Sequence, residues 1–153
     1  MANFGYMAIF FEAEEILGIL EEMGLTGVRL AKTPQNFHTT VEFYGSNKPD
    51  PETLAELEKL RKEPVEVNVL IVAYGNNGET EGFRVIVPHG LRHQEVQNNG
   101  VTPLHITISI AEGHEAKETG KNSFDQPIKR PFKVKGLLGW SLSPLFKEAE
   151  YRP

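Results

Sequence analysis

The chain has 153 residues, of which 39% are hydrophobic and 24% charged, the size and balance of one ordinary folded domain. It contains no cysteine, which excludes disulfides, thiolate metal sites and a cysteine nucleophile. Sixteen basic against 21 acidic residues give a net charge of −5, so no DNA duplex is expected as a partner. The sequence shows no membrane-length apolar run and no basic leader, which predicts a cytoplasmic protein without a membrane partner.

The first half of the chain alternates between strand and helix patterns. In order, these predict a strand at Tyr6–Phe11, a helix at Ala13–Met23, a short strand at Val28–Leu30, a strand at Phe37–Tyr44, and a helix that starts at Asp50-Pro51-Glu52. Asp50 can cap the second helix, because its side chain can accept a hydrogen bond from a backbone N–H of the first turn, and Pro51 suits that turn.

The second half predicts a hairpin, a helix and two further strands. The ranges are strands at Glu66–Tyr74 and Gly82–Val87 around a Gly75–Thr80 turn, a helix at Pro88–Asn99, a strand at Leu104–Ile110, a polar connecting arm at Ala111–Arg130, and a strand at Phe132–Ser141. We therefore expect one α+β domain over residues 1–153, with helix-and-strand lobes that are related by internal pseudo-symmetry.

Two of the predicted strands begin with a histidine that is followed two residues later by threonine: His38-Thr39-Thr40-Val41 and His105-Ile106-Thr107-Ile108. Because side chains two apart on a strand share a face, each histidine points with its threonine. The other faces are expected to be buried, and they carry Leu104, Ile106, Ile108 and Ile110 in the second strand and Phe37, Val41 and Phe43 in the first. The alternative is that two strand histidines merely precede threonine, which is a good strand former.

These paired His-x-Thr-x motifs, one in each half of a small α+β chain, resemble those of the 2H phosphoesterase superfamily. Within it, the chain looks most similar to the phage anti-CBASS nucleases, which would place it in a host cytoplasm. The resemblance implies a bilobal fold, with two pseudo-symmetric antiparallel-sheet lobes flanked by helices around a central groove that both motifs face. Thr39 departs from the family, in which this position is usually apolar.

The motif chemistry suits displacement at phosphorus. The attacking oxygen must lose a proton and the leaving oxygen must gain one, and imidazoles can do both near neutral pH. His38 and His105 are therefore the predicted catalytic pair, and the hydroxyls of Thr40 and Thr107 are predicted to hold the phosphate. This chemistry needs no metal or other cofactor. The sequence does not assign which histidine is the base.

Three further residues are candidates for substrate binding. Tyr6 and Trp140 could stack on a nucleobase, with core packing as the alternative. Arg92 could contact a phosphate or a base, with an ordinary surface arginine as the alternative. His89 and His93 have the spacing of two metal ligands on a helix, but no carboxylate motif accompanies them, so no metal site is predicted.

Three functions remain in competition. The first is a metal-independent phosphodiesterase that hydrolyses a cyclic nucleotide or cyclic oligonucleotide second messenger. The second is a 2',3'-cyclic phosphodiesterase that acts on RNA ends, held by a lysine-rich C-terminal third. The third is a catalytically silent protein that sequesters a nucleotide. The base, ring size and linkage of the substrate and the oligomeric state stay open.

Overall fold

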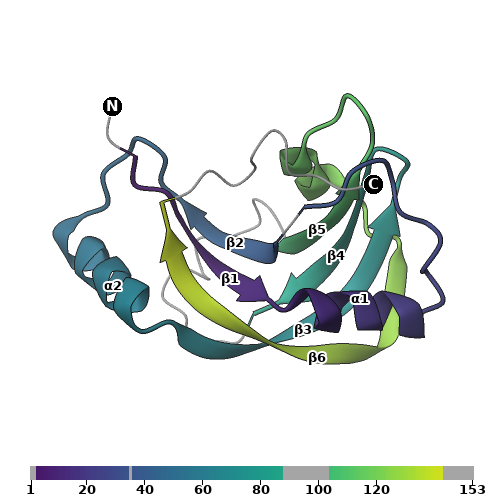
Figure 1. Ribbon diagram of the computed structural model, residues 1–153, viewed down its shortest axis with the longest axis horizontal. Coiled ribbons are helices and arrows are strands. Elements are labelled where there is room, and N and C mark those ends of the chain that lie inside the picture. Colours follow the sequence, from purple (N-terminus) through teal and green to yellow (C-terminus); the bar gives the residue numbers. More distant parts are fainter. Residues whose placement is uncertain (1–2, 35, 88–103, 143–153) are drawn as a thin grey trace.

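The computed structural model describes residues 3–34, 36–87 and 104–142, and Figure 1 draws the remainder as a thin trace. The helix predicted at Pro88–Asn99, together with Arg92 and both histidines of that segment, lies outside the described residues. Neither of the two described α-helices is long and apolar enough to cross a membrane.

The expected α+β class is confirmed. The elements are β1 (Tyr6–Phe11), α1 (Ala13–Glu22), β2 (Phe37–Phe43), α2 (Pro51–Lys62), β3 (Val65–Asn76), β4 (Thr80–Ile86), β5 (His105–Ile110), a 3-10 helix η1 (Ala116–Lys121) and β6 (Gln126–Ser141). All neighbouring strands are antiparallel, in the order β2-β1-β6-β3-β4-β5. The six-stranded sheet curves so strongly that its two end strands, β2 and β5, contact each other (Figure 1).

Local sequence explains the helix α2 and the β3–β4 turn. The Asp50 carboxylate accepts a hydrogen bond from the Thr53 N–H at 2.7 Å, which caps α2 as predicted. In the turn, the Asn77 side chain accepts from the N–H of Glu79 at 2.9 Å and of Thr80 at 2.8 Å. Gly78 adopts a φ of 84°, which glycine reaches without steric cost. The turn between β3 and β4 is therefore shorter than the predicted range Gly75–Thr80.

One predicted strand does not form and one predicted strand starts earlier than expected, each for an identifiable reason. Val28–Leu30 forms no strand, because side chains take its backbone groups: the Leu30 N–H donates to the Ser109 hydroxyl at 3.0 Å, and Asn76 donates to the Val28 carbonyl at 3.3 Å. The final strand starts at Gln126 instead of Phe132, so it takes up the end of the predicted polar arm.

Two prolines explain why the sequence did not predict the early start of β6. Pro127 and Pro131 lie in a stretch that pairs with β3, whereas β1 pairs only with Gly136–Ser141. A strand that has a described partner on one side alone tolerates proline, because the missing N–H need not bridge to a second neighbour.

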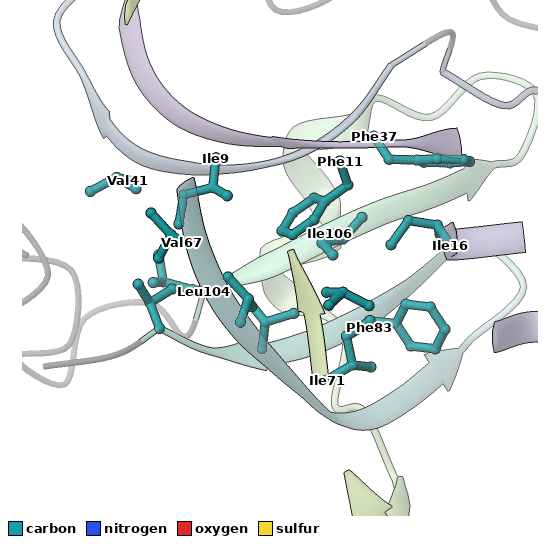
Figure 2. Close-up of a cluster of buried hydrophobic side chains, with 14 of the residues drawn as sticks. Ile9, Phe11, Ile16, Phe37, Val41, Val67, Ile71, Phe83, Leu104 and Ile106 are labelled. Carbon is teal, nitrogen blue, oxygen red and sulfur yellow. The ribbon is translucent and has the colours of Figure 1, made fainter. Parts of the chain in front are cut away.

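The hydrophobic core lies on one face of every strand, and Figure 2 shows its central part. The predicted apolar face of β5 is buried, with exposed fractions of 0 to 3% for Leu104, Ile106, Ile108 and Ile110. Helices α1 and α2 add Ile16, Ile19, Leu20 and Leu57 to the same cluster.

The buried face of β2 differs from the prediction at Phe43, which is 61% exposed. In the β1–β2 register, Ala8 pairs with Thr40 and Met7 with Glu42, so that Val41 is the extra residue of a bulge. Beyond this bulge, the side chains of β2 alternate between the two faces in the opposite phase. Phe43 therefore points away from the core. Thr39 is fully buried between Phe37 and Val41 instead.

The buried Thr39 hydroxyl makes no hydrogen bond with any described residue, which leads to a stability prediction. Because valine has nearly the same shape and no polar group to desolvate, Thr39→Val should raise the free energy of unfolding by about 1 kcal/mol. Urea denaturation followed by circular dichroism measures the change, with exposed Thr26→Val as the control. A less stable Thr39→Val protein would show that the hydroxyl has a partner.

Candidate functional site

The two His-x-Thr motifs lie on β2 and β5, the strands that meet where the curved sheet nearly closes. His38 and His105 are each half-buried. They interact electrostatically, since the charge of His105 contributes to the pKa of His38. The structure therefore brings together two residues that are 67 positions apart in the sequence, the difference between 105 and 38.

Aromatic rings surround His38 on the face opposite the core. The ring centroids of Tyr6 and Phe10 each lie 5.8 Å from its imidazole, and Phe10 is its partner in the β1–β2 register. Nδ1 lies 3.3 Å from the Asn36 carbonyl oxygen. A carbonyl can only accept, so Nδ1 carries the proton in this contact, and the lone pair of the neutral ring is on Nε2.

The surroundings of His38 favour its neutral form. Burial lowers its pKa below the ordinary 6.5, the hydrogen bond to the Asn36 carbonyl opposes this shift, and the charge of His105 lowers the pKa further. The net direction is downward. An imidazole of this kind is unprotonated at neutral pH, which is the state that a general base requires.

The threonines accompany their histidines as the alternation predicts. Thr40 pairs with Ala8 while His38 pairs with Phe10, which places both side chains on one face of the β1–β2 pair. Thr107 donates to the hydroxyl of buried Thr119 at 2.9 Å. Because hydroxyl protons rotate, either threonine can be the donor in this contact. Sequence analysis did not identify Thr119, which is in the segment predicted to be an irregular polar arm.

His105 is one member of a second cluster, which sequence analysis missed. Its ring is stacked on Phe124, with centroids 6.4 Å apart and planes at 29°. The Arg84 guanidinium carbon lies 5.3 Å from the centroid of the same phenyl ring. Arg84 and His105 are also directly opposed in the β4–β5 register. The available signals were a lone charge inside the apolar run GFRVIV and a lone aromatic residue in a polar segment.

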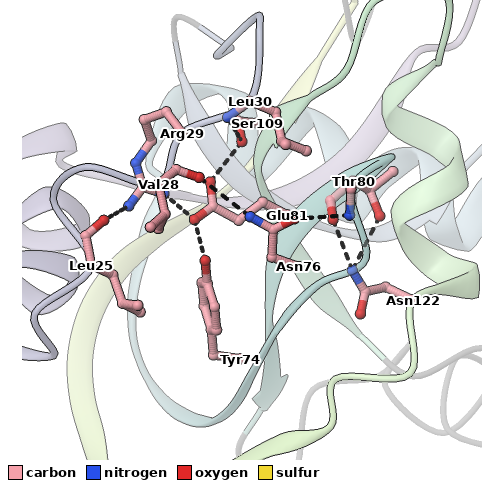
Figure 3. Close-up of polar contacts among 11 residues, drawn as sticks. Leu25, Val28, Arg29, Leu30, Tyr74, Asn76, Thr80, Glu81, Ser109 and Asn122 are labelled. Carbon is pink, nitrogen blue, oxygen red and sulfur yellow. Dashed lines mark hydrogen bonds and ion pairs between the residues drawn. The ribbon is translucent and has the colours of Figure 1, made fainter.

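Phe124 is held in an unusual backbone conformation. Its φ is 48°, in the left-handed region that residues with a side chain rarely adopt. The Asn122 side chain accepts from the Phe124 N–H at 2.9 Å. It also donates to the Thr80 carbonyl at 3.0 Å, as Figure 3 shows. A Cβ at Gly75 would lie 2.7 Å from the Phe124 Cα. Glycine at that position is therefore what lets the segment pack against β3.

Figure 3 shows a buried polar network around Glu81, which the strand register places on the face of β4 opposite to Arg84. The Glu81 side chain is fully buried and forms an ion pair with Arg29. The Tyr74 hydroxyl donates to the same carboxylate, and the Ser109 hydroxyl donates to it at 2.6 Å. Burial, followed by the bond to Glu81, raises the pKa of Tyr74. The network joins β3, β4, β5 and the segment after α1, and thereby fixes the strands that carry Arg84 and His105.

Of the two residues that were predicted to stack on a base, only Tyr6 lies next to a histidine of the site. Tyr6 is buried next to His38, on the face of the histidines. Trp140 pairs with Met7 on the opposite face, its indole N–H donates to the Phe4 carbonyl at 2.6 Å, and Arg61 lies 5.9 Å from its ring. Trp140 is thus not brought to the histidines, and its surroundings match the packing alternative.

A hollow lies at the end of β1, and two of its lining residues, Phe10 and Asn36, contact His38. Its volume is about 520 Å³, and the rest of its lining includes Leu137, the cation Lys135 and the carboxylates Glu12, Glu15 and Glu66. This volume lies within the range of small-ligand sites, and the lining combines apolar surface with a few charged groups. Among the described side chains, no group of three or more histidines and carboxylates is placed to hold a metal ion.

The sequence matches no protein-family model and no curated protein.

The buried network yields a second stability prediction. Glu81→Gln removes the charge that compensates Arg29, and leaving a buried ion without its partner costs about 3 kcal/mol. We therefore expect the urea midpoint to fall sharply, while Glu79→Gln, which changes a mostly exposed carboxylate in the adjacent turn, leaves it almost unchanged. Equal midpoints for the two variants would mean that the Glu81 network contributes nothing to stability.

The surroundings of His38 predict its titration. In NMR spectra, the His38 ring should titrate below pH 6.5, and in His105→Asn its pKa should rise but stay below 6.5, because burial is the larger cause. His114, whose hydrogen bond to Glu118 raises its pKa, should titrate above 6.5 and serves as the internal control. Titration of His38 at or above 6.5 would contradict its burial.

The same shift makes stability depend on pH. The unfolded chain binds a proton on His38 at about pH 6.5, whereas the folded chain binds it only at lower pH. The contribution of His38 to the free energy of unfolding is therefore lost as the pH falls from about 6.5 to the folded-state pKa.

Proposed function

We propose that the protein is a metal-independent phosphodiesterase of the 2H type, which hydrolyses cyclic nucleotide or cyclic oligonucleotide second messengers. The observation that carries the proposal is that His38 and His105 lie on β2 and β5, the two end strands of the sheet, which contact each other. In this proposal the strand order divides into β2-β1-β6 and β3-β4-β5, two lobes that each have a histidine strand at the outer end.

The proposed reaction is an in-line attack of water on phosphorus. Nε2 of His38 takes a proton from the water as the new P–O bond forms, and the imidazolium of His105 gives a proton to the leaving oxygen as the old P–O bond breaks. The products are an alcohol and a phosphomonoester, which in a cyclic oligonucleotide become the two ends of one linear chain, and proton exchange with solvent restores both rings. The lowered pKa of His38 supports its assignment as the base.

The hollow at the end of β1 supports a compact substrate, because Phe10 and Leu137 offer apolar surface to a nucleobase. Lys135 in its lining forms an ion pair with Glu66 at 3.6 Å, so no phosphate contact is assigned to it. The overall charge of −5 favours a ligand recognised in a local pocket over an extended polynucleotide.

One observation favours RNA ends as a second candidate substrate. Lys129, Arg130, Lys133 and Lys135 are all exposed along β6, where they could follow the backbone of a single strand. The reaction at phosphorus would be the same for both candidate substrates. They would differ in the part of the substrate that is attached to the scissile phosphate.

A substrate panel tests the function. The protein is incubated without added metal with cyclic dinucleotides, cyclic trinucleotides, 2',3'-cyclic mononucleotides and RNA that ends in a 2',3'-cyclic phosphate, and the products are resolved by chromatography. Linear products from the cyclic oligonucleotides would support the proposal. Turnover restricted to 2',3'-cyclic ends would favour the RNA candidate, and tight binding without turnover would overturn the enzymatic proposal in favour of sequestration.

Catalysis by the histidine pair predicts the effect of removing either ring. His38→Ala and His105→Ala should each lower the rate by about 10²–10⁴-fold at unchanged fold, because each removes one proton transfer from the transition state. His114→Ala, which removes a histidine held by Glu118, should retain full activity, and EDTA should have no effect. A doubly substituted His38/His105 protein with normal turnover would disprove the mechanism.

A further inference from the structure

We propose that Arg84 and Phe124 form with His105 an anion-binding site that holds an oxygen of the substrate phosphate. The inference rests on the proposed function for the identity of the substrate, but the anion site can be tested without turnover. The ligand class is a phosphate group, bound in the plane of the guanidinium fork.

Arg84 and His105 occupy positions from which both can reach one ligand. Arg84 and His105 are directly opposed residues of neighbouring antiparallel strands, and such side chains lie on one face with Cβ atoms about 4.5–5.5 Å apart. An oxyanion that contacts the His105 ring is therefore within reach of the guanidinium. Both groups also contact the Phe124 ring, so the three side chains form one continuous surface.

The Arg84 side chain has a buried donor, Nε, that lacks an acceptor among the described residues. Within the same residues, no carboxylate forms an ion pair with it, whereas Arg29, which is also partly buried, is paired with Glu81. A buried N–H that lacks an acceptor is costly, and a phosphate oxygen would supply the acceptor and the opposite charge together.

The Phe124 ring supports the Arg84 guanidinium. Phe124 lies under Arg84 in a left-handed conformation that Asn122 stabilises, so its place is fixed by the surrounding structure. A guanidinium stacked on an aromatic ring has restricted orientations and loses less freedom when it binds. The arginine is thus oriented before the ligand arrives.

Inorganic phosphate is the probe for the test. The ring signals of His105 are followed by NMR while phosphate is added to the wild-type protein, to Arg84→Gln and to Arg61→Gln. Arg61 is the matched control, since it is also a cation on an aromatic ring, that of Trp140, on the opposite face from His38. We expect Arg84→Gln to weaken phosphate binding at least about 10-fold, and Arg61→Gln to leave it unchanged.

Arg84→Lys provides the second variant, and it keeps the charge and the aliphatic stem if Arg84→Gln does not fold. The proposal expects Arg84→Lys to bind phosphate more weakly than wild type, because an ammonium cannot form the paired contacts of a guanidinium. The inference is overturned if phosphate does not shift the His105 signals of the wild type, or if folded Arg84 variants bind it as tightly. A protein that turns over no substrate of the panel but still binds phosphate through Arg84 would refute the proposed function and leave the anion site standing.

Discussion

The contact between β2 and β5 is the constraint on which the candidate site depends. These strands are the two ends of the sheet order, and only the strong curvature of the sheet brings His38 near His105. The core supplies the reason for the curvature, because all six strands turn an apolar face to one hydrophobic cluster. Burial of that cluster therefore also holds β2 against β5, the two strands that carry the imidazoles.

The two faces of β4 carry different kinds of charged group. On the core side, Glu81 joins Arg29, Tyr74 and Ser109 in a network that holds three strands together. On the other side, Arg84 meets Phe124 and His105. A charged group with protein partners thus fixes the strand, while a charged group without a described carboxylate partner faces the candidate site. This division matches the general contrast between buried groups that stabilise a fold and buried groups that await a ligand.

The features that sequence analysis predicted are those decided by near neighbours in the chain. Alternation placed Leu104, Ile106 and Ile108 in the core, and the order Asp50-Pro51 marked the start of α2. The features it missed depend on distant partners. Phe43 leaves the core because of a bulge opposite β1, and Arg84 meets Phe124 across 40 positions of sequence, the difference between 124 and 84. No periodicity within one segment carries that information.

The prolines of β6 have a further consequence for the behaviour of the protein in solution. Along Gln126–Lys135, β3 covers one side of the strand and no described strand covers the other. An uncovered strand side invites another polypeptide to add itself, but Pro127 and Pro131 lack the N–H that such an addition needs, and Lys129 and Arg130 add like charges. The early segment of β6 is thereby protected against self-association, and this stretch can remain open to solvent at high protein concentration.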